Sequence, residues 1–225
     1  DGDADFLSTD MAPLPEESAE LWAPVAADIE QARVDDIQQP RNAVQIADGA
    51  PGDMTFAENA VNLGVSVTGW SWSGLLGDLD DDGRVDLYVV NGMQAEGIFE
   101  TLPDGELVQP NQAFRNDGTA FTPMPDWGLA SVDGGRGMAQ ADVDGDGDLD
   151  LYVANYRTTT IRTTGFAVLN VGGKRMIRPQ DRNHLEYTAE GRVLEHGEPD
   201  IFYRNDGTGR FIPDTWAQGT FRDED

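Results

Sequence analysis

The sequence predicts an all-β fold, a partial β-propeller of four-stranded blades, and three observations lead to this prediction. An Asp-rich loop recurs at a fixed spacing, and an Asn-Asp-Gly turn between two strand-like runs recurs as well. The chain also contains 26 Gly and 12 Pro, a composition that favours many short strands joined by turns. Its 225 residues, 39% of them hydrophobic, suffice for the core of one large domain. We therefore predict one partial propeller domain over residues 1–225.

The Asp-rich loops define the repeat. Asp78–Asp86 and Asp142–Asp150 align without a gap, 64 residues apart. A β-prone run that ends in Asn follows each loop, at residues 87–91 and 151–155. The first six residues match the second half of the same motif. We therefore expect a first copy that begins upstream of residue 1.

A second repeated element consists of a strand, an Asn-Asp-Gly turn and another strand. It occurs at Phe114–Phe121 and at Tyr203–Phe211, and a weaker third copy runs from Arg41-Asn42 to Phe56. Each repeat then consists of a hairpin, a linking strand, an Asp loop and a strand. Four strands per unit are typical of a propeller blade, and about three blades are visible.

Two stretches interrupt the repeat. The first, about residues 12–40, contains apolar residues at helical spacing between Pro15 and Gln38, so we expect an inserted amphipathic helix. The second, residues 157–199, contains apolar runs on both sides of Gly172-Gly173, which predicts an inserted hairpin. Long insertions between strands are frequent sites of partner contacts.

The Asp loops are candidate calcium sites. Oxygen ligands at alternate positions of a tight loop can converge on one Ca²⁺ ion, and Mg²⁺ is less suitable because it requires octahedral geometry and retains its waters. In the first loop the candidate ligands are Asp78, Asp80, Asp82, the carbonyl of Arg84, and Asp86. In the second loop they are Asp142, Asp144, Asp146, Asp148 and Asp150. In the truncated copy they are Asp1, Asp3 and Asp5. The sequence thus predicts two complete Ca²⁺ sites and one truncated site.

An EF-hand is the main alternative for these loops, because its loop begins in the same way. An EF-hand requires a bidentate Glu at position 12, and this position is Val89 in one loop and Val153 in the other. A strand-like run also follows each loop in place of a helix. These two differences exclude an EF-hand.

The Asp-x-Asp-x-Asp-Gly loops and the Arg-Asn-Asp-Gly-Thr hairpins resemble the FG-GAP/VCBS repeats of integrin-alpha-type β-propellers. Gly69–Gly74 and Gly135–Met138, just before the loops, are similar to bacterial relatives of cartilage acidic protein, which often carry an ASPIC/UnbV domain. The resemblance implies a seven- or eight-bladed propeller, secreted or surface-exposed, with calcium at the blade loops and a role in adhesion or protein interaction.

Charge and residue content restrict the function further. The formal net charge is −27, so a nucleic acid partner would be repelled, and no apolar run is long enough for a transmembrane helix. With two His, no Cys and no Gly-x-Ser-x-Gly motif, the chain is not expected to be an enzyme. We expect an extracytoplasmic calcium-binding scaffold for a protein partner or surface complex, secreted, periplasmic or at the cell surface. Two alternatives remain, a polysaccharide lyase or hydrolase on a propeller scaffold with a glycan ligand, and an accessory subunit of a larger surface or membrane complex.

Overall fold

The structure, a computed structural model, describes residues 5–11, 41–49, 53–92, 109–156, 165–182, 185–197 and 199–214. Within these ranges the regular elements are β-strands and two short 3₁₀ turns, which confirms the all-β prediction. The helix expected within about residues 12–40, and the candidate ligands Asp1 and Asp3, lie outside the described residues. No described sheet closes on itself.

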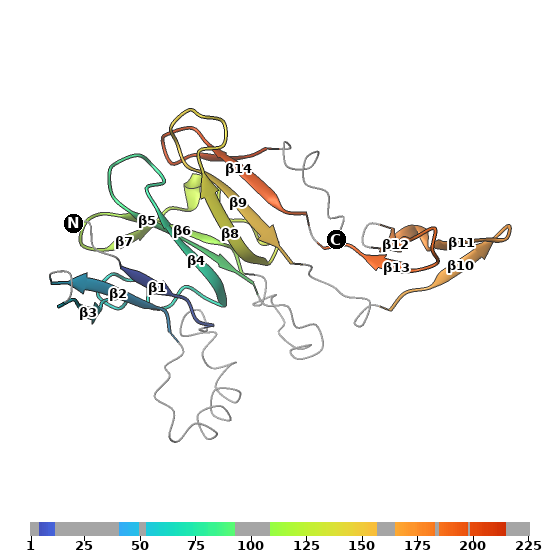
Figure 1. The fold of residues 1–225 in the computed structure, drawn as a ribbon, viewed down its shortest axis with the longest axis horizontal. Coiled ribbons are helices and arrows are strands. Elements are labelled where there is room, and N and C mark those ends of the chain that lie inside the picture. The colour runs from blue at the N-terminus through green and yellow to red at the C-terminus, as the bar shows by residue number, and fades with distance from the viewer. Residues whose placement is uncertain are drawn as a thin grey trace, which may run out of the picture.

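Two four-stranded antiparallel sheets form the centre of the molecule (Figure 1). The first complete sheet has the order β4-β5-β6-β7, with β4 Ser71–Gly77, β5 Asp86–Asn91, β6 Gln112–Asn116 and β7 Phe121–Pro123. The second complete sheet has the order β15-β14-β9-β8, with β8 Gly135–Ala141, β9 Asp150–Asn155, β14 Ile201–Asn205 and β15 Phe211–Asp214. A 3₁₀ turn, η1 (Pro125–Trp127), lies between β7 and β8.

The predicted number of strands per unit is right, but the sheets divide the chain elsewhere. The sequence repeat places the Asn-Asp-Gly hairpin first and the Asp loop last. In the structure the Asp-loop hairpin β4–β5 and the following Asn-Asp-Gly hairpin β6–β7 belong to one sheet. The hydrogen bonds between β5 and β6 decide this grouping, and they are formed between residues that the repeat alone does not pair.

The N-terminal sheet has three strands in the order β1-β2-β3, with β1 Phe6–Ser8, β2 Ala43–Asp48 and β3 Thr55–Glu58. Its strands correspond to the last three of a complete sheet. The amide of Ala47 donates to Asp5 Oδ1 at 2.9 Å, just as the amide of Asn116 donates to Asp86 Oδ1 at 2.8 Å. The third hairpin expected from the sequence is therefore present as β2–β3.

The alignment of Arg41-Asn42 with the Asn-Asp-Gly motif is wrong. The amide of Asn42 donates to Ser66 O at 2.9 Å, and the amide of Asn111 donates to Ser131 O at 2.8 Å. Asn42 therefore occupies the place of Asn111, before the strand, and not that of Asn116 at its end. An Asn is used at both places, so residue type alone could not distinguish them.

Alternation along β5 explains how the sheets stack. Leu87 and Val89 are buried in a core shared with Val44 of the N-terminal sheet. Tyr88 and Val90 point the other way, into a core shared with the second complete sheet. A strand whose two faces are both covered is apolar throughout, as residues 87–90 are.

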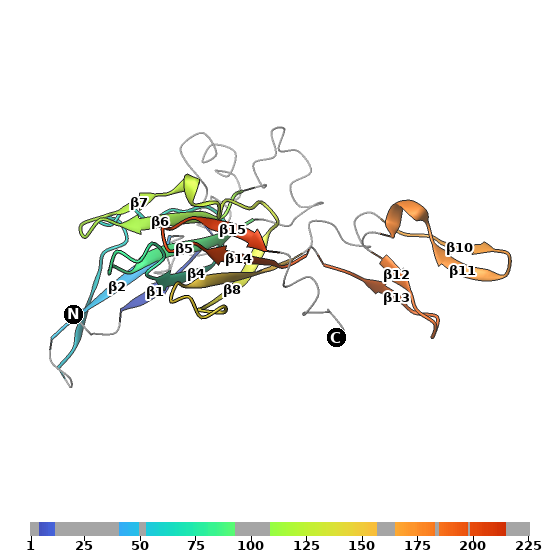
Figure 2. The same ribbon diagram turned by 90° about the horizontal axis from the view of Figure 1, so that it is seen from above.

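Two hairpins between β9 and β14 lie to one side of the sheets in both views (Figures 1 and 2). The first pairs β10 (Val168–Val171) with β11 (Lys174–Ile177) across Gly172-Gly173, as expected from the sequence. The second pairs β12 (Leu185–Tyr187) with β13 (Val193–Glu195), and it was not predicted. The 3₁₀ turn η2 (Pro179–Asp181) lies between them. We call residues 165–197 the hairpin arm.

No helix among the described residues has both the length and the apolar character that crossing a membrane requires.

Candidate metal centre

Each Asp loop is the hairpin connection between the first two strands of a complete sheet. Gly77 pairs with Asp86 across the first loop, and Ala141 pairs with Asp150 across the second. The Gly at position 6 was expected to allow the sharp turn, and it has a positive φ in both loops, 85° at Gly83 and 105° at Gly147. The loops therefore fold as tight turns that bring side chains from several positions together.

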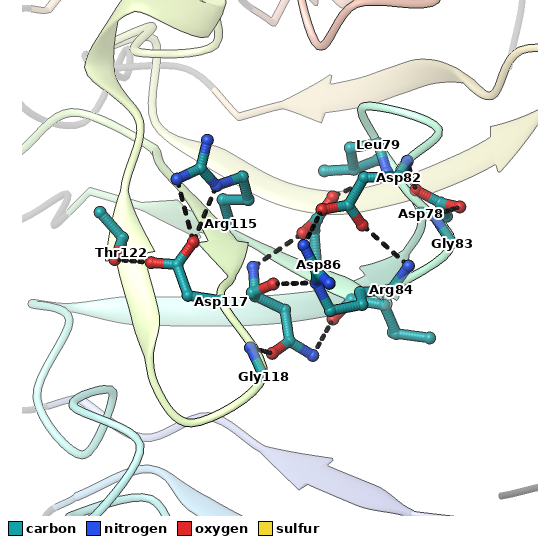
Figure 3. A network of polar contacts seen from close by, with 12 residues as sticks. Asp78, Leu79, Asp82, Gly83, Arg84, Asp86, Arg115, Asp117, Gly118 and Thr122 are labelled. Carbon is teal, nitrogen blue, oxygen red and sulfur yellow. Dashed lines mark hydrogen bonds and ion pairs between the residues drawn. The ribbon is translucent and has the colours of Figure 1, made fainter.

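The first Asp of each loop accepts hydrogen bonds from the loop backbone. Asp78 accepts from the amides of Asp82 at 3.1 Å and Gly83 at 2.9 Å (Figure 3). In the second loop Asp142 accepts from the amides of Gly145 at 2.7 Å and Gly147 at 3.2 Å. These bonds turn both carboxylates toward the interior of the loop.

The last Asp of each loop joins three segments. Asp86 is fully buried and accepts from the amides of Leu79 at 2.9 Å and Asn116 at 2.8 Å. Asp150 is equally buried and accepts from the corresponding amides, Val143 at 3.1 Å and Asn205 at 3.0 Å. This carboxylate ties the loop to the third strand of the sheet.

The structure brings together a different group of carboxylates in each loop. Each group comprises three residues with one ligand oxygen apiece, all within 4.8 Å of one another. The groups are Asp78, Asp80 and Asp86 in the first loop, and Asp142, Asp144 and Asp146 in the second. Both consist entirely of residues that the sequence named as candidate ligands.

Asp82 is not part of the first group, because a basic side chain within the loop binds it. Arg84 Nη2 lies 2.6 Å from Asp82 Oδ2, and Arg84 Nε donates to Asn116 O at 2.8 Å (Figure 3). The predicted role of the Arg84 carbonyl as a metal ligand stays a prediction. The second loop has Asp148 in the same place and therefore contains no basic residue of its own.

Asp148 interacts with the first loop. A hydrogen bond with Asp81 raises the pKa of the Asp148 carboxyl to about 6. Asp81 has a φ of 56°, where the second loop has Gly145 with a φ of 80°. The two loops thus meet through a pair of carboxyls, one from each complete sheet.

Electrostatics within the groups favour a cation. Desolvation, followed by the charge of Asp82, raises the pKa of Asp80, and desolvation also raises the pKa of Asp86. Desolvation and the charge of Asp146 raise the pKa of Asp144. Asp80 Oδ1 is buried and has no hydrogen-bond partner among the described residues. A divalent cation would relieve both the repulsion and the missing contact.

Two Asn residues of the Asn-Asp-Gly hairpins hold the backbone of the Asp loops, and the sequence had indicated them only as turn residues. Asn116 Nδ2 donates to Val85 O at 3.0 Å, and Asn205 Nδ2 donates to Leu149 O at 3.2 Å. Asn205 Nδ2 also donates to Leu79 O of the first loop at 3.0 Å. The common occurrence of both motifs in each repeat was the signal that could have linked them.

The truncated copy retains its last position. Asp5 accepts from the amide of Ala47, as Asp86 and Asp150 accept from the amides of the corresponding third strands. Asp5 is exposed in the described residues. The structure therefore supports its place in the repeat, and its role as a metal ligand stays a prediction.

Comparison with known proteins supports the repeat family for one part of the chain. A search among curated proteins finds no match. Residues 103–153, which include β6, β7, β8 and the second Asp loop, match the family model of the FG-GAP-like repeat.

Proposed function

We propose that this protein is an extracytoplasmic repeat scaffold of the β-propeller type, stabilised by calcium at its Asp loops, that binds a protein partner. The match to the FG-GAP-like repeat at residues 103–153 supports an extracellular-type repeat scaffold for interaction. The observation that carries the calcium assignment is the convergence of three carboxylates in each of two loops.

The stacking of the sheets supports a propeller. Tyr88 and Val90 of β5 face the following sheet, whereas Leu151 and Val153 of β9 face the preceding one. By the same alternation Tyr152 faces away from the preceding sheet, and with Phe202 it borders a hollow of about 340 Å³. The corresponding face of the first complete sheet is covered by the next repeat, so a further repeat fits against the second sheet in a similar way.

The residues fit calcium as the bound ion. Asp78, Asp80 and Asp86 would hold one ion, and Asp142, Asp144 and Asp146 a second. The donors are carboxylate oxygens, which hard divalent cations prefer, and the unpartnered Asp80 Oδ1 supplies a ready ligand atom. Bound calcium would neutralise the groups and favour the folded chain, because the unfolded chain cannot gather three carboxylates at one point.

We infer a location outside the cytoplasm and a function without a catalytic step. Calcium at micromolar to millimolar concentration, the range that sensor and extracellular sites require, is available there. The chain offers two His and no Cys for catalysis, and its clustered carboxylates are assigned to metal.

The hairpin arm is the proposed contact surface for a protein partner. Its first hairpin exposes apolar side chains, with Leu169 38% and Val171 56% exposed. Exposed apolar side chains of this kind often mark a protein interface. If Leu169→Ser with Val171→Ser leaves partner binding unchanged, this hairpin is not the contact surface.

Thermal unfolding tests the calcium assignment. The melting temperature is measured in chelator, in calcium and in magnesium, for the parent chain and for the double variant Asp80→Asn, Asp144→Asn. We expect calcium to raise the melting temperature of the parent by several degrees, since ligand at about 100 times its dissociation constant adds about 2.7 kcal/mol. The double variant should lose most of this rise.

The matched control is Asp126→Asn, which removes an exposed carboxylate of η1 outside both loops. It should respond to calcium as the parent does. Equal melting temperatures of the parent in chelator and in calcium would refute the assignment, and an equal response to magnesium would remove the preference for calcium.

A further inference from the structure

The hairpin arm contains a pocket that lies away from the Asp loops. Its volume is about 400 Å³, and its lining comes from β11, β12 and the segments that follow η2 and β13. A cavity of this size is within the range of small-ligand sites. It is formed by two hairpins that the repeat itself does not require.

The charge of the arm differs from that of the rest of the chain. Residues 165–197 contain five of the chain's 15 Lys and Arg residues, but only four of its 42 Asp and Glu residues. The arm is therefore slightly positive on a protein whose formal net charge is −27. An anionic ligand would be repelled by the rest of the surface and would be tolerated here.

Two guanidinium groups of the pocket lack a carboxylate partner among the described residues. Arg175 Nη1 donates to the hydroxyl of Tyr187 at 3.4 Å. Arg182 donates to Ile177 O at 3.4 Å and to Met176 Sδ at 3.7 Å, both long contacts. Arg178 of the same arm, by contrast, forms an ion pair with Asp181 at 2.6 Å. Arg175 and Arg182 thus retain strong donors for a carboxylate or sulfate group.

The remaining lining supplies two further kinds of contact. Ile177 and Leu185 are buried, with 3% and 6% exposure, and they are the aliphatic side chains of the lining. Glu186 and His196 also line the pocket, with His196 Nε2 3.6 Å from Glu186 Oε2. Glu186 would repel a simple anion but would accept hydrogen bonds from hydroxyl groups. The pocket thus combines donors for an oxyanion, acceptors for hydroxyls and an apolar surface.

We propose that this pocket binds an acidic sugar residue, with its carboxylate or sulfate at Arg175 and Arg182, its hydroxyls at Glu186 and His196, and its ring face on Ile177 and Leu185. A pyranose ring that carries an anionic group satisfies all three kinds of contact. The proposal goes beyond calcium-dependent scaffolding and does not depend on metal in the Asp loops.

Calorimetric titration of the full chain tests this proposal. The ligands are a galacturonic acid disaccharide, a galactose 6-sulfate disaccharide, a neutral galactose disaccharide and inorganic sulfate. We expect one or both acidic sugars to bind and the neutral sugar and sulfate to bind at least about tenfold more weakly, since each lost charge-assisted contact is worth about a factor of ten or more. The carboxylate and sulfate arms distinguish the two sources of negative charge.

Variants locate the binding. Arg175→Gln with Arg182→Gln should weaken binding of the acidic sugar at least about tenfold. Arg192→Gln, an exposed Arg of the same arm outside the pocket, should leave it unchanged. Asp80→Asn with Asp144→Asn should also leave it unchanged, because the pocket contains no residue of the Asp loops. A sugar acid that is bound through calcium in the loops would instead lose affinity in this variant.

Equal affinity for neutral and acidic sugars would overturn the proposal, as would affinity for sulfate equal to that for the sugars. Retained binding in the double Arg variant, or lost binding in the Asp80 and Asp144 variant, would equally overturn it. Because the calcium assignment is tested by thermal unfolding and this one by sugar affinity, failure of either proposal is recognised separately.

Discussion

The two Asp loops share one sequence pattern and one backbone turn, yet they present different carboxylates. In the first loop the buried Asp86 joins Asp78 and Asp80, whereas in the second the group consists of the exposed Asp142, Asp144 and Asp146. Position 7 accounts for the absence of Asp82 from the first group. Arg84 pairs with Asp82 at 2.6 Å and removes it from the first group, whereas the second loop has Asp148 there. A pattern of ligands in sequence therefore does not determine which ligands meet.

The loops also differ in how the rest of the protein holds them. In the first loop, the carbonyl of Leu79 accepts a hydrogen bond from Asn205 Nδ2 of the neighbouring sheet. The second loop forms an ion pair with a basic residue from outside the loop, since Arg204 Nη1 lies 3.4 Å from Asp144 Oδ2. Arg204 Nη2 also lies 2.9 Å from Asp214 Oδ2. The first loop is thus fixed by burial and hydrogen bonds, and the second is more exposed and more acidic. Four experiments with substituted proteins test which features the two loops share and which differ.

The largest effect is expected at the position that both loops share. Asp86→Ala leaves the amides of Leu79 and Asn116 without their acceptor, so the free energy of unfolding should fall by about 2–4 kcal/mol. Urea denaturation in chelator measures this loss without a contribution from calcium. Asp150→Ala should have a similar effect, and Asp86→Asn a smaller one, because an amide retains one acceptor. A loss below about 1 kcal/mol in both Ala variants would contradict a structural role.

The second largest loss of stability is expected on removal of the hydrogen bond from Asn205 to Leu79, which has no equivalent in the second loop among the described residues. Asn205→Ala removes two hydrogen bonds donated by the Nδ2 amide of a buried side chain, and we expect a loss of about 1–3 kcal/mol in the free energy of unfolding. Asn116→Ala, at the equivalent place, removes one exposed donor and should cost about 0.5–1 kcal/mol. Parallel urea titrations decide the order. If both variants lose the same amount, the bond from Asn205 to Leu79 does not stabilise the contact between the sheets.

A charge change should alter the calcium affinity of the first loop. Arg84→Gln removes the partner of Asp82, so its carboxylate can turn to a bound ion, and affinity should rise about two- to fivefold. Calorimetry on the Asp144→Asn background isolates the first loop. Asp148→Arg, made on the Asp80→Asn background, is the reverse change and should weaken binding in the second loop. Unchanged affinity in both would show that position 7 does not govern the groups.

The smallest effect is a pH dependence of stability in chelator. The pKa of Asp148 is raised from 3.8 to about 6 in the folded chain, so the folded state binds more protons than the unfolded state between these values. Its contribution therefore decreases stability as the pH rises from about 4 to about 6. Asp81→Gly removes the partner that raises this pKa, and it also relieves the positive φ.

Melting curves of the parent chain and of Asp81→Gly between pH 4 and about 7 measure this contribution by difference. The two curves are subtracted because other carboxyls also make stability depend on pH. Hydrogen bonds from Thr122 and Thr208 lower the pKa values of Asp117 and Asp206, so these two groups make stability increase with pH in the parent and in the variant alike. The variant should gain relative stability as the pH rises. A parallel pair of curves would exclude a proton shared between Asp81 and Asp148.

Much of the fold followed from the sequence because its signals are local. The Asn-Asp-Gly turns, the Gly residues at position 6 of the loops and the apolar run of β5 each depend on neighbours within a few residues. The second hairpin of the arm was missed because β12 and β13 are three residues each and have no strong turn motif. The place of Asn42 was wrong because only long-range bonds distinguish it from Asn116.

By itself the sequence determined an all-β repeat chain with strong local turns and two acidic loops whose carboxylates must be close in any compact state. Only the tertiary structure decided how the strands are grouped into sheets, which three carboxylates meet in each loop, and that Asn205 bonds to residue 79, far away along the chain. The physical reason is the range of the interactions. Turn geometry is set by adjacent residues, whereas hydrogen bonds and ion pairs between distant segments exist only once the sheets have packed.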